Sequence, residues 1–164
     1  MNQDIELKDI RELPRYHGET ITDEYLDIMG HMNVQWYVAL FSRAVTGLFN
    51  ELGLTEEYFT PGESGTFALR QYINYLAEVR PGETISIHSR LVGRSEKKIH
   101  LVHFMVNETR QVLSSTLETL ISHADLKLRK TSPFPVEIAA RIDPLVALSD
   151  SLGWEPPLSG TMRA

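Results

Sequence analysis

A broad apolar stripe runs through residues 34–52, VQWYVALFSRAVTGLFNEL. Apolar side chains recur there every three or four positions, which is the spacing of one face of an α-helix. A stripe this wide is typical of a helix that other structure encloses on most sides. We therefore predict one long, mostly buried helix that ends before Gly53, a residue suited to the left-handed position after a helix. Gly47 inside this helix is more simply a tolerated glycine than the mark of a close backbone contact.

Alternating apolar and polar residues replace the helical pattern further along the chain, and this alternation is the period of β-strands. Ile85 and Ile87, for example, fall on one face of a strand. His88 and Arg90 fall on the other face. Four such strands are predicted, over 66–79, 84–93, 99–108 and 112–128, and a short first strand is predicted within 16–24. The order predicts an α+β domain in which a curved antiparallel β-sheet is wrapped around one long central helix.

Three segments divide the chain. Residues 1–15 are polar and charged, and we expect an N-terminal arm that stops at Pro14. Residues 16–128 hold the helix and strands described above. Residues 129–164 contain several prolines that interrupt the pattern, so we expect a C-terminal extension with two short helices that lies over the domain or over a neighbouring subunit.

The composition is that of a soluble globular protein, with 42% hydrophobic and 23% charged residues in a chain of 164, close to one ordinary domain. The formal net charge of −6 does not favour nucleic acid as a partner. The chain has no cysteine, which excludes disulfides, thiolate metal sites and a cysteine nucleophile. The N-terminus has no apolar leader pattern, and no run approaches the roughly 20 apolar residues that span a bilayer. We expect a cytoplasmic protein without a membrane partner.

A compact polar motif precedes the long helix. Asp27, Gly30, His31 and Asn33 lie within seven residues. Asn33 stands at the N-cap position, where its side-chain oxygen can accept a free amide of the first turn. A helix N-terminus can hold an anion, or an oxygen that becomes one during a reaction. The spacing alone leaves two interpretations of Asp27 open: a catalytic carboxylate beside that helix end, or an Asx-type turn residue.

The motif Asp-x-x-Gly-His-x-Asn-x-x-x-Tyr, followed by one long helix and four strands, resembles the hotdog-fold acyl-CoA thioesterases of the 4-hydroxybenzoyl-CoA thioesterase-like family. The resemblance covers about residues 17–128. It implies a hotdog fold, hydrolysis of an acyl-CoA to a carboxylic acid and coenzyme A, no metal or other cofactor, and a homodimer or dimer-based homo-oligomer with sites between subunits. The proline-containing tail is faintly similar to the thioesterases of carnitine and betaine breakdown, which does not select a substrate.

The same resemblance implies roles for residues of the motif. Asp27 acts on the thioester as a nucleophile or as a base for water, and the backbone amide of Val34 polarises the thioester carbonyl. His31 and Asn33 line the site and orient the reacting groups. Met29 is a departure, because several relatives carry an asparagine at this position. Without that asparagine, the residue that would position the attacking water is not identified.

Binding residues are also expected outside the catalytic group. Gly30 permits φ > 0 or a close approach of the substrate, and Tyr37 is a core residue with a chance of reaching the pocket. Arg94, Lys97 and Lys98 surround one hairpin turn. They are either a solvated turn or a patch that contacts the phosphates of coenzyme A.

Two other functions remain open from the sequence. One is a hydratase or dehydratase of the same fold, which would use His31 together with Asp27. The other is a non-catalytic acyl-CoA-binding domain, which Met29 keeps open. Two further chemistries fail on spacing. Residues 62–66 resemble a nucleophile elbow but lack its final glycine, and His100 and His103 should point to opposite faces of a strand, which makes a poor metal pair.

Overall fold

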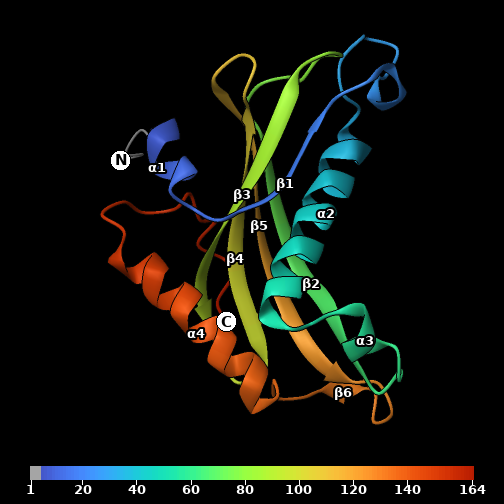
Figure 1. The fold of residues 1–164 in the computed structure, drawn as a ribbon, viewed down its shortest axis with the longest axis vertical. Coiled ribbons are helices and arrows are strands. Elements are labelled where there is room, and N and C mark those ends of the chain that lie inside the picture. Colours follow the sequence, from blue (N-terminus) through green and yellow to red (C-terminus); the bar gives the residue numbers. More distant parts are fainter. Residues whose placement is uncertain (1–4) are drawn as a thin grey trace. The chain divides into compact units, whose positions relative to one another are not determined.

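The computed structural model describes residues 5–164 and contains the predicted mixture of helices and strands (Figure 1). Its strands are β1 (Arg15–Thr20), β2 (Ser64–Tyr75), β3 (Thr84–Arg94), β4 (Lys98–Asn107), β5 (Val112–Asp125) and β6 (Lys130–Thr131). Its helices are α1 (Leu7–Arg11), the short 3-10 helix η1 (Asp23–Tyr25), α2 (Val34–Leu52), α3 (Glu56–Phe59) and α4 (Val136–Ser151). The sheet has the strand order β1-β3-β4-β5-β2, and β6 pairs with β5. The α+β prediction is confirmed.

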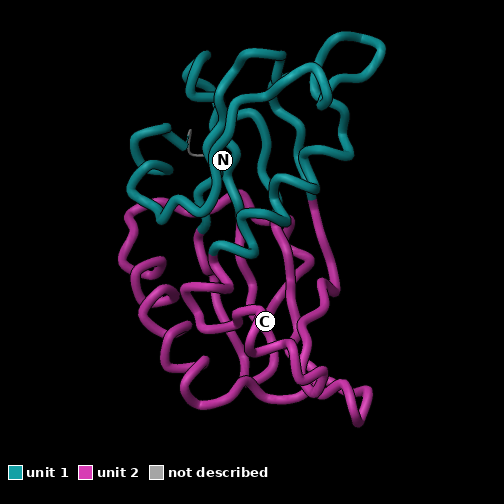
Figure 2. Tube along the Cα trace, turned by 45° about the vertical axis from the view of Figure 1, so that its right-hand side comes forward, with its two compact units in different colours: residues 1–47, 73–89, 103–117 teal, residues 48–72, 90–102, 118–164 magenta. Residues whose placement is uncertain are grey.

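Two compact units make up the described chain (Figure 2). Unit 1 contains residues 1–47, 73–89 and 103–117. Unit 2 contains residues 48–72, 90–102 and 118–164. The motif before α2 lies in unit 1, whereas the hairpin turn with the three basic residues lies in unit 2.

Helix α2 begins and ends where the apolar stripe predicts, at Val34 and Leu52. Gly53 follows it with φ +84°, the left-handed conformation expected after a helix. The interpretation of Gly47 as merely tolerated is wrong. A Cβ atom at position 47 would lie 2.8 Å from the carbonyl oxygen of Tyr16, so the glycine allows α2 to approach the backbone of β1.

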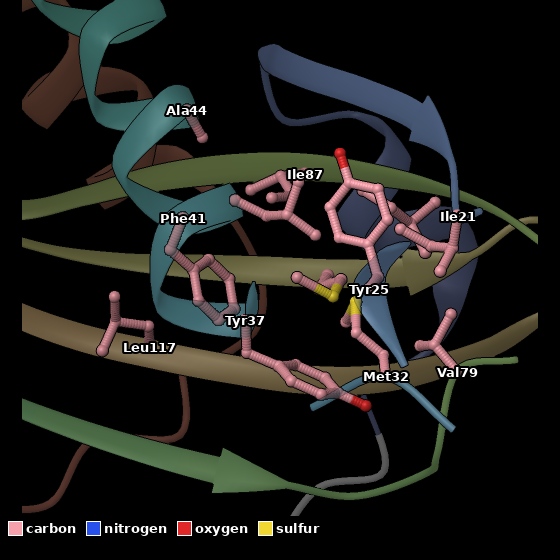
Figure 3. Packing of buried hydrophobic residues seen from close by; sticks show 12 residues of the cluster. Ile21, Tyr25, Met32, Tyr37, Phe41, Ala44, Val79, Ile87 and Leu117 are labelled. Carbon is pink, nitrogen blue, oxygen red and sulfur yellow. The ribbon is translucent and has the colours of Figure 1, made fainter. Parts of the chain in front are cut away.

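The core of unit 1 forms where α2 meets the inner face of the sheet (Figure 3). Tyr37 and Phe41 project from α2 into this cluster, and Ile87 of β3 and Leu117 of β5 meet them. All four are at most 4% exposed, because α2 presents the wide apolar stripe that its sequence predicts. The core therefore holds the N-terminal half of α2 in place.

The polar face of β3 is buried as well. His88 is 5% exposed and its Nδ1 lies 3.0 Å from the carbonyl oxygen of Leu13, in the predicted N-terminal arm. Ile10 of α1 is fully buried, so the arm packs on its unit; residues 1–4 of the arm lie outside the described residues. In unit 2, Arg90 donates hydrogen bonds to the side chain and carbonyl oxygen of Ser149 at 2.7 and 2.9 Å.

The C-terminal extension differs from its prediction. We expected two short helices separated at Pro144, but α4 runs through this proline from Val136 to Ser151. Proline in a helix interior removes one hydrogen bond and crowds the preceding turn. Packing outweighs that cost, since Ile138 and Ile142 are at most 3% exposed and Ser149 is held by Arg90 beyond the proline. Within residues 5–164, no helix is long and apolar enough to cross a bilayer.

Candidate functional site

The motif folds into a short closed loop. An isolated β-bridge joins Leu26 to Met32. Inside it, the Asp27 N–H donates to the carbonyl oxygen of His31 at 3.0 Å, and the Gly30 N–H donates to the carbonyl oxygen of Asp27 at 3.1 Å. Gly30 has φ +81°, as its expected role requires. These bonds hold Asp27 and His31 close together just before α2.

The Asp27 carboxylate uses its two oxygens differently. Oδ1 accepts the backbone N–H of Met29 at 2.8 Å, which is the Asx-type turn that the sequence left open. Oδ2 lies 3.6 Å from Nδ1 of His31. The Asp27 side chain is only 17% exposed, and that of His31 is 30% exposed. The turn interpretation and the catalytic interpretation are therefore compatible, because the turn occupies one oxygen and leaves the second beside the imidazole.

Asn33 caps α2 as predicted. Its side-chain oxygen accepts the N–H of Gln35 at 3.0 Å. Its own N–H donates to the carbonyl oxygen of Tyr25 at 2.8 Å. The Val34 side chain, next along the chain, is 60% exposed, and the first turn of α2 carries no acidic residue. The positive end of the helix dipole is therefore unneutralised by its own first turn and can stabilise a developing negative charge.

A polar cluster holds Tyr25, and through it the start of α2. The Tyr25 hydroxyl donates to Glu19 Oε1, and Arg43 Nη1 donates to Glu19 Oε2. His17 Nε2 lies 2.6 Å from the same Oε2. Partial burial alone would raise the pKa of Glu19, but the hydrogen bonds from Tyr25, His17 and Arg43 outweigh it and the pKa lies below its usual value. Sequence reasoning missed this cluster, because its members are far apart in the chain.

A cavity of about 230 Å³ lies in unit 1 beside the motif. It is lined by His31, Met32, Val34, Tyr37, Tyr75, Leu76, Ala77 and Glu78. Three predicted site residues, His31, Val34 and Tyr37, thus share one pocket wall. Asp27, Gly30 and Asn33 are not among the lining residues, although the loop and the helix cap hold them next to this wall.

Tyr37 belongs both to the core and to the pocket. It is 4% exposed, and its ring meets that of Tyr75 edge to face, with centroids 5.1 Å apart. Burial raises the pKa of the Tyr37 hydroxyl, so the group stays neutral under ordinary conditions. The expectation that Tyr37 reaches the pocket agrees with its position in the lining.

The remaining lining residues, 75–78, are the part of the pocket that sequence reasoning missed. A strand was predicted as far as residue 79, but β2 ends at Tyr75. The N–H groups of Leu76 and Ala77 both donate to the carbonyl oxygen of Ser114, at 2.8 and 3.1 Å, which breaks the regular ladder. Glu78 in this segment pairs with Arg80 through Nε at 2.9 Å.

The three basic residues of the hairpin turn lie in unit 2, and one of them is paired. Arg94 Nη2 donates to Asp143 Oδ2 at 2.9 Å, and Nε donates to Oδ1. The Asp143 hydrogen bonds raise the pKa of Arg94, and Arg94 in turn lowers the pKa of Asp143. Lys97 and Lys98 are half-buried. The alternatives of solvated turn and phosphate contact stay open for these two lysines.

The two histidines of β4 have separate surroundings. His100 Nε2 lies 2.8 Å from Glu118 Oε1 in unit 2, and His103 Nδ1 lies 2.6 Å from Ser89 Oγ in unit 1. No group of three or more histidine, aspartate and glutamate side chains that could hold a metal ion occurs in the described part of the chain.

Comparison with known proteins places the chain in a family. A model of the thioesterase-like superfamily matches residues 21–142. The betainyl-CoA thioesterase of Pseudomonas aeruginosa is 26% identical over 125 residues, which cover 76% of this chain and 79% of that protein. The L-carnitine dehydrogenase/betainyl-CoA thioesterase of Agrobacterium fabrum is 29% identical over 133 residues, which cover 81% of this chain. The match spans only 27% of that second, longer relative.

Solved structures share the fold. A Staphylococcus aureus protein in complex with CoA superposes with a TM-score of 0.82 at 23% identity, covering 93% of this chain and 96% of that chain. The 1,4-dihydroxy-2-naphthoyl-CoA thioesterase of Synechocystis gives a TM-score of 0.72 at 13% identity, covering 80% of this chain and 98% of that chain. The hotdog-fold prediction is confirmed. Because the family model matches well over half of its length, the chain belongs to the thioesterase-like superfamily.

Proposed function

We propose that this protein is an acyl-CoA thioesterase, a hydrolase that converts an acyl-CoA and water into a free carboxylic acid and coenzyme A. Family membership and relatives named as CoA thioesterases support this function. The observation that carries it is the Asp27 carboxylate, with Oδ2 facing His31, held just before the capped N-terminus of α2. A carboxylate and an oxyanion-stabilising helix end are the two groups that thioester hydrolysis needs.

The proposed reaction begins at the thioester carbonyl. Asp27 Oδ2 removes a proton from water as the water oxygen bonds to the carbonyl carbon, or attacks that carbon itself. The backbone N–H of Val34 stabilises the negative charge that develops on the carbonyl oxygen. When water attacks, the C–S bond then breaks and the coenzyme A thiolate takes up the proton that the water lost. When Oδ2 itself attacks, breaking of the C–S bond leaves a mixed anhydride on Asp27; water hydrolyses this anhydride to the free acid and the Asp27 carboxylate, and the thiolate takes up the released proton. The Met29 N–H orients the Asp27 carboxylate, and His31 places its imidazole beside Oδ2. Asn33 and Gly30 hold the helix end and the loop in shape.

Met29 is compatible with this reaction. The side chain at position 29 is 71% exposed, and the residue contributes its backbone N–H to Asp27. Any residue other than proline at position 29 supplies that donor, so the asparagine of several relatives is not required to orient the carboxylate. This geometry favours a catalytic domain over a domain that only binds thioesters.

We propose that the hairpin turn binds the phosphates of coenzyme A. Lys97 and Lys98 supply positive charges to this contact, and Arg94 adds its charge while it remains paired with Asp143. Alanine at Lys97 or Lys98 is expected to raise KM severalfold and to weaken the salt dependence of KM. If KM and its salt dependence are unchanged in both variants, the turn is only solvated and does not contact coenzyme A.

We further propose a homodimer that pairs through β2, in a cytoplasmic enzyme. Strand β2 ends the order β1-β3-β4-β5-β2, so one of its edges is unpaired within the described chain. Large apolar side chains along it are 47–51% exposed, namely Phe67, Leu69 and Tyr72. An exposed edge with such side chains is suited to pairing with a second copy. Sedimentation of the native chain and of the Leu69→Lys variant measures the oligomeric state of each.

The test of the function is thiol release from a panel of short, long, branched and aromatic acyl-CoAs. A thiol-reactive dye suits it, because the chain has no cysteine. Asp27→Asn is expected to abolish turnover, and Asp23→Asn, in the exposed 3-10 helix η1, is the matched control that keeps it. No release from any thioester, or full activity in Asp27→Asn, would overturn the proposal. Loss of enoyl absorbance without thiol release would indicate a hydratase instead.

A further inference from the structure

The curated relatives are named for a betainyl group, and at 26–29% identity they do not fix the acyl group of this chain. The pocket beside the motif gives chemical information of its own. Its lining contains two tyrosine rings, Tyr37 and Tyr75, one carboxylate, Glu78, and no lysine or arginine. An aromatic pair with one acidic residue is an unusual environment for a plain hydrocarbon chain.

The two rings are arranged so that neither stacks flat on the other. Their planes meet at 86° with centroids 5.1 Å apart. An edge-to-face pair presents ring faces in two directions, and ring faces attract cations. Tyr75 is 48% exposed, so its ring remains accessible to a ligand.

Glu78 places negative charge next to these rings. It lines the same pocket as Tyr37 and Tyr75, and its carboxylate is among the charges that raise the pKa of the Tyr37 hydroxyl, after the larger effect of burial. Arg80 contacts only Oε1 of Glu78, and the Arg80 side chain is 63% exposed. An ion pair this exposed is weak and screened by solvent, and it leaves Oε2 of Glu78 available to a second cation.

We propose that this pocket selects acyl groups that carry a fixed positive charge close to the thioester, such as a quaternary ammonium group, through Tyr37, Tyr75 and Glu78. This inference rests on the proposed thioesterase function and names its substrate class. Quaternary ammonium groups bind in cages of aromatic rings and carboxylates, because they are cations that cannot donate strong hydrogen bonds.

Size and local charge agree with this class. A cavity of about 230 Å³ is smaller than the roughly 300–1,000 Å³ of pockets for drug-sized ligands, which suits a short acyl group. His31 is the remaining titratable group in the lining, and its Nδ1 faces Asp27, whose carboxylate offsets a charge on the imidazole.

The test compares two CoA thioesters of nearly equal shape. Betainyl-CoA carries a trimethylammonium group, and 3,3-dimethylbutanoyl-CoA carries a neutral tert-butyl group in the same place. We expect kcat/KM for the cationic thioester to exceed that for the neutral one by about tenfold or more. Equal values would overturn the cation subsite and leave the thioesterase intact. Absence of turnover with every thioester of the wider panel would overturn the hydrolase itself, and the subsite with it.

Variants of the pocket residues test which side chains produce the preference for the cationic thioester. Glu78→Gln is expected to lower the ratio of the two kcat/KM values about tenfold, and Tyr75→Leu to lower it severalfold. Tyr75→Phe, which keeps the ring, should restore the ratio. Glu24→Gln removes an exposed carboxylate outside the pocket and should leave both rates unchanged. An unchanged ratio in Glu78→Gln and in Tyr75→Leu, both folded by circular dichroism, would overturn the assignment.

Discussion

Nδ1 of His31 lies 3.6 Å from Oδ2 of Asp27. This separation brings the imidazole close enough for charge attraction but is longer than an ordinary hydrogen bond. Asp27 is instead oriented by the Met29 N–H through Oδ1. The residue whose N–H orients the carboxylate is therefore not the residue whose imidazole lies beside its second oxygen.

Replacing His31 should therefore harm activity less than replacing Asp27. We expect His31→Gln to lower kcat about tenfold, whereas loss of a general base costs about 10²–10⁴-fold. Steady-state thiol release by the two single variants and the double variant measures both effects. A loss in His31→Gln as large as that in Asp27→Asn would show that the imidazole takes part in the chemistry directly.

The N-cap of α2 can be tested separately for its structural and electrostatic roles. Asn33→Ala should lower the free energy of unfolding by about 1 kcal/mol and also lower kcat. Asn33→Ser should restore both, because a serine oxygen can accept the Gln35 N–H. Asn33→Asp should restore stability alone, since its negative charge lies where an oxyanion would develop. Equal kcat values for the serine and aspartate variants would argue against an oxyanion at this helix end.

Gly47 is required by the close approach of Tyr16. In Gly47→Ala the new Cβ would lie 2.8 Å from the Tyr16 carbonyl oxygen. Overpacking of this kind costs about 1–3 kcal/mol, which exceeds the gain of about 1 kcal/mol from placing alanine in a helix. Urea denaturation should show net destabilisation. Gly93→Ala is the control, because a Cβ there meets nothing within 4 Å.

His103 makes stability depend on pH. Burial lowers its pKa to about 3 from an ordinary value of 6.5, so the folded protein holds a neutral imidazole. Below pH 6.5, His103 binds a proton in the unfolded chain but stays neutral in the folded protein. The stability that this group contributes is complete above pH 6.5 and is lost as the pH falls toward 3.

Urea unfolding at pH 7.5 and pH 5 measures this dependence. The native chain should lose about 2 kcal/mol at pH 5 through this residue, and His88, whose pKa is also lowered by burial, adds to the loss in the same direction. In His103→Gln the loss should be smaller by that amount. A variant with the same pH dependence as the native protein would contradict the assignment.

Features that depend on short sequence separations could be predicted from the chain. The bounds of α2 follow from its apolar stripe, and Asn33 and Gly53 end it through contacts with residues one to five positions away. The loop with Asp27 and His31 is similarly local. These elements also carry the family motif, which is why the fold class and the family were correct.

Other features depend on partners distant in sequence, and periodicity contains no information about them. Gly47 is needed because Tyr16 is its neighbour, and α4 continues through Pro144 because packing on both sides compensates for the proline. Glu78 reaches the pocket because the ladder of β2 breaks at Ser114. The catalytic motif is thus specified by local hydrogen bonding, whereas the pocket wall that faces it arises only when distant segments meet.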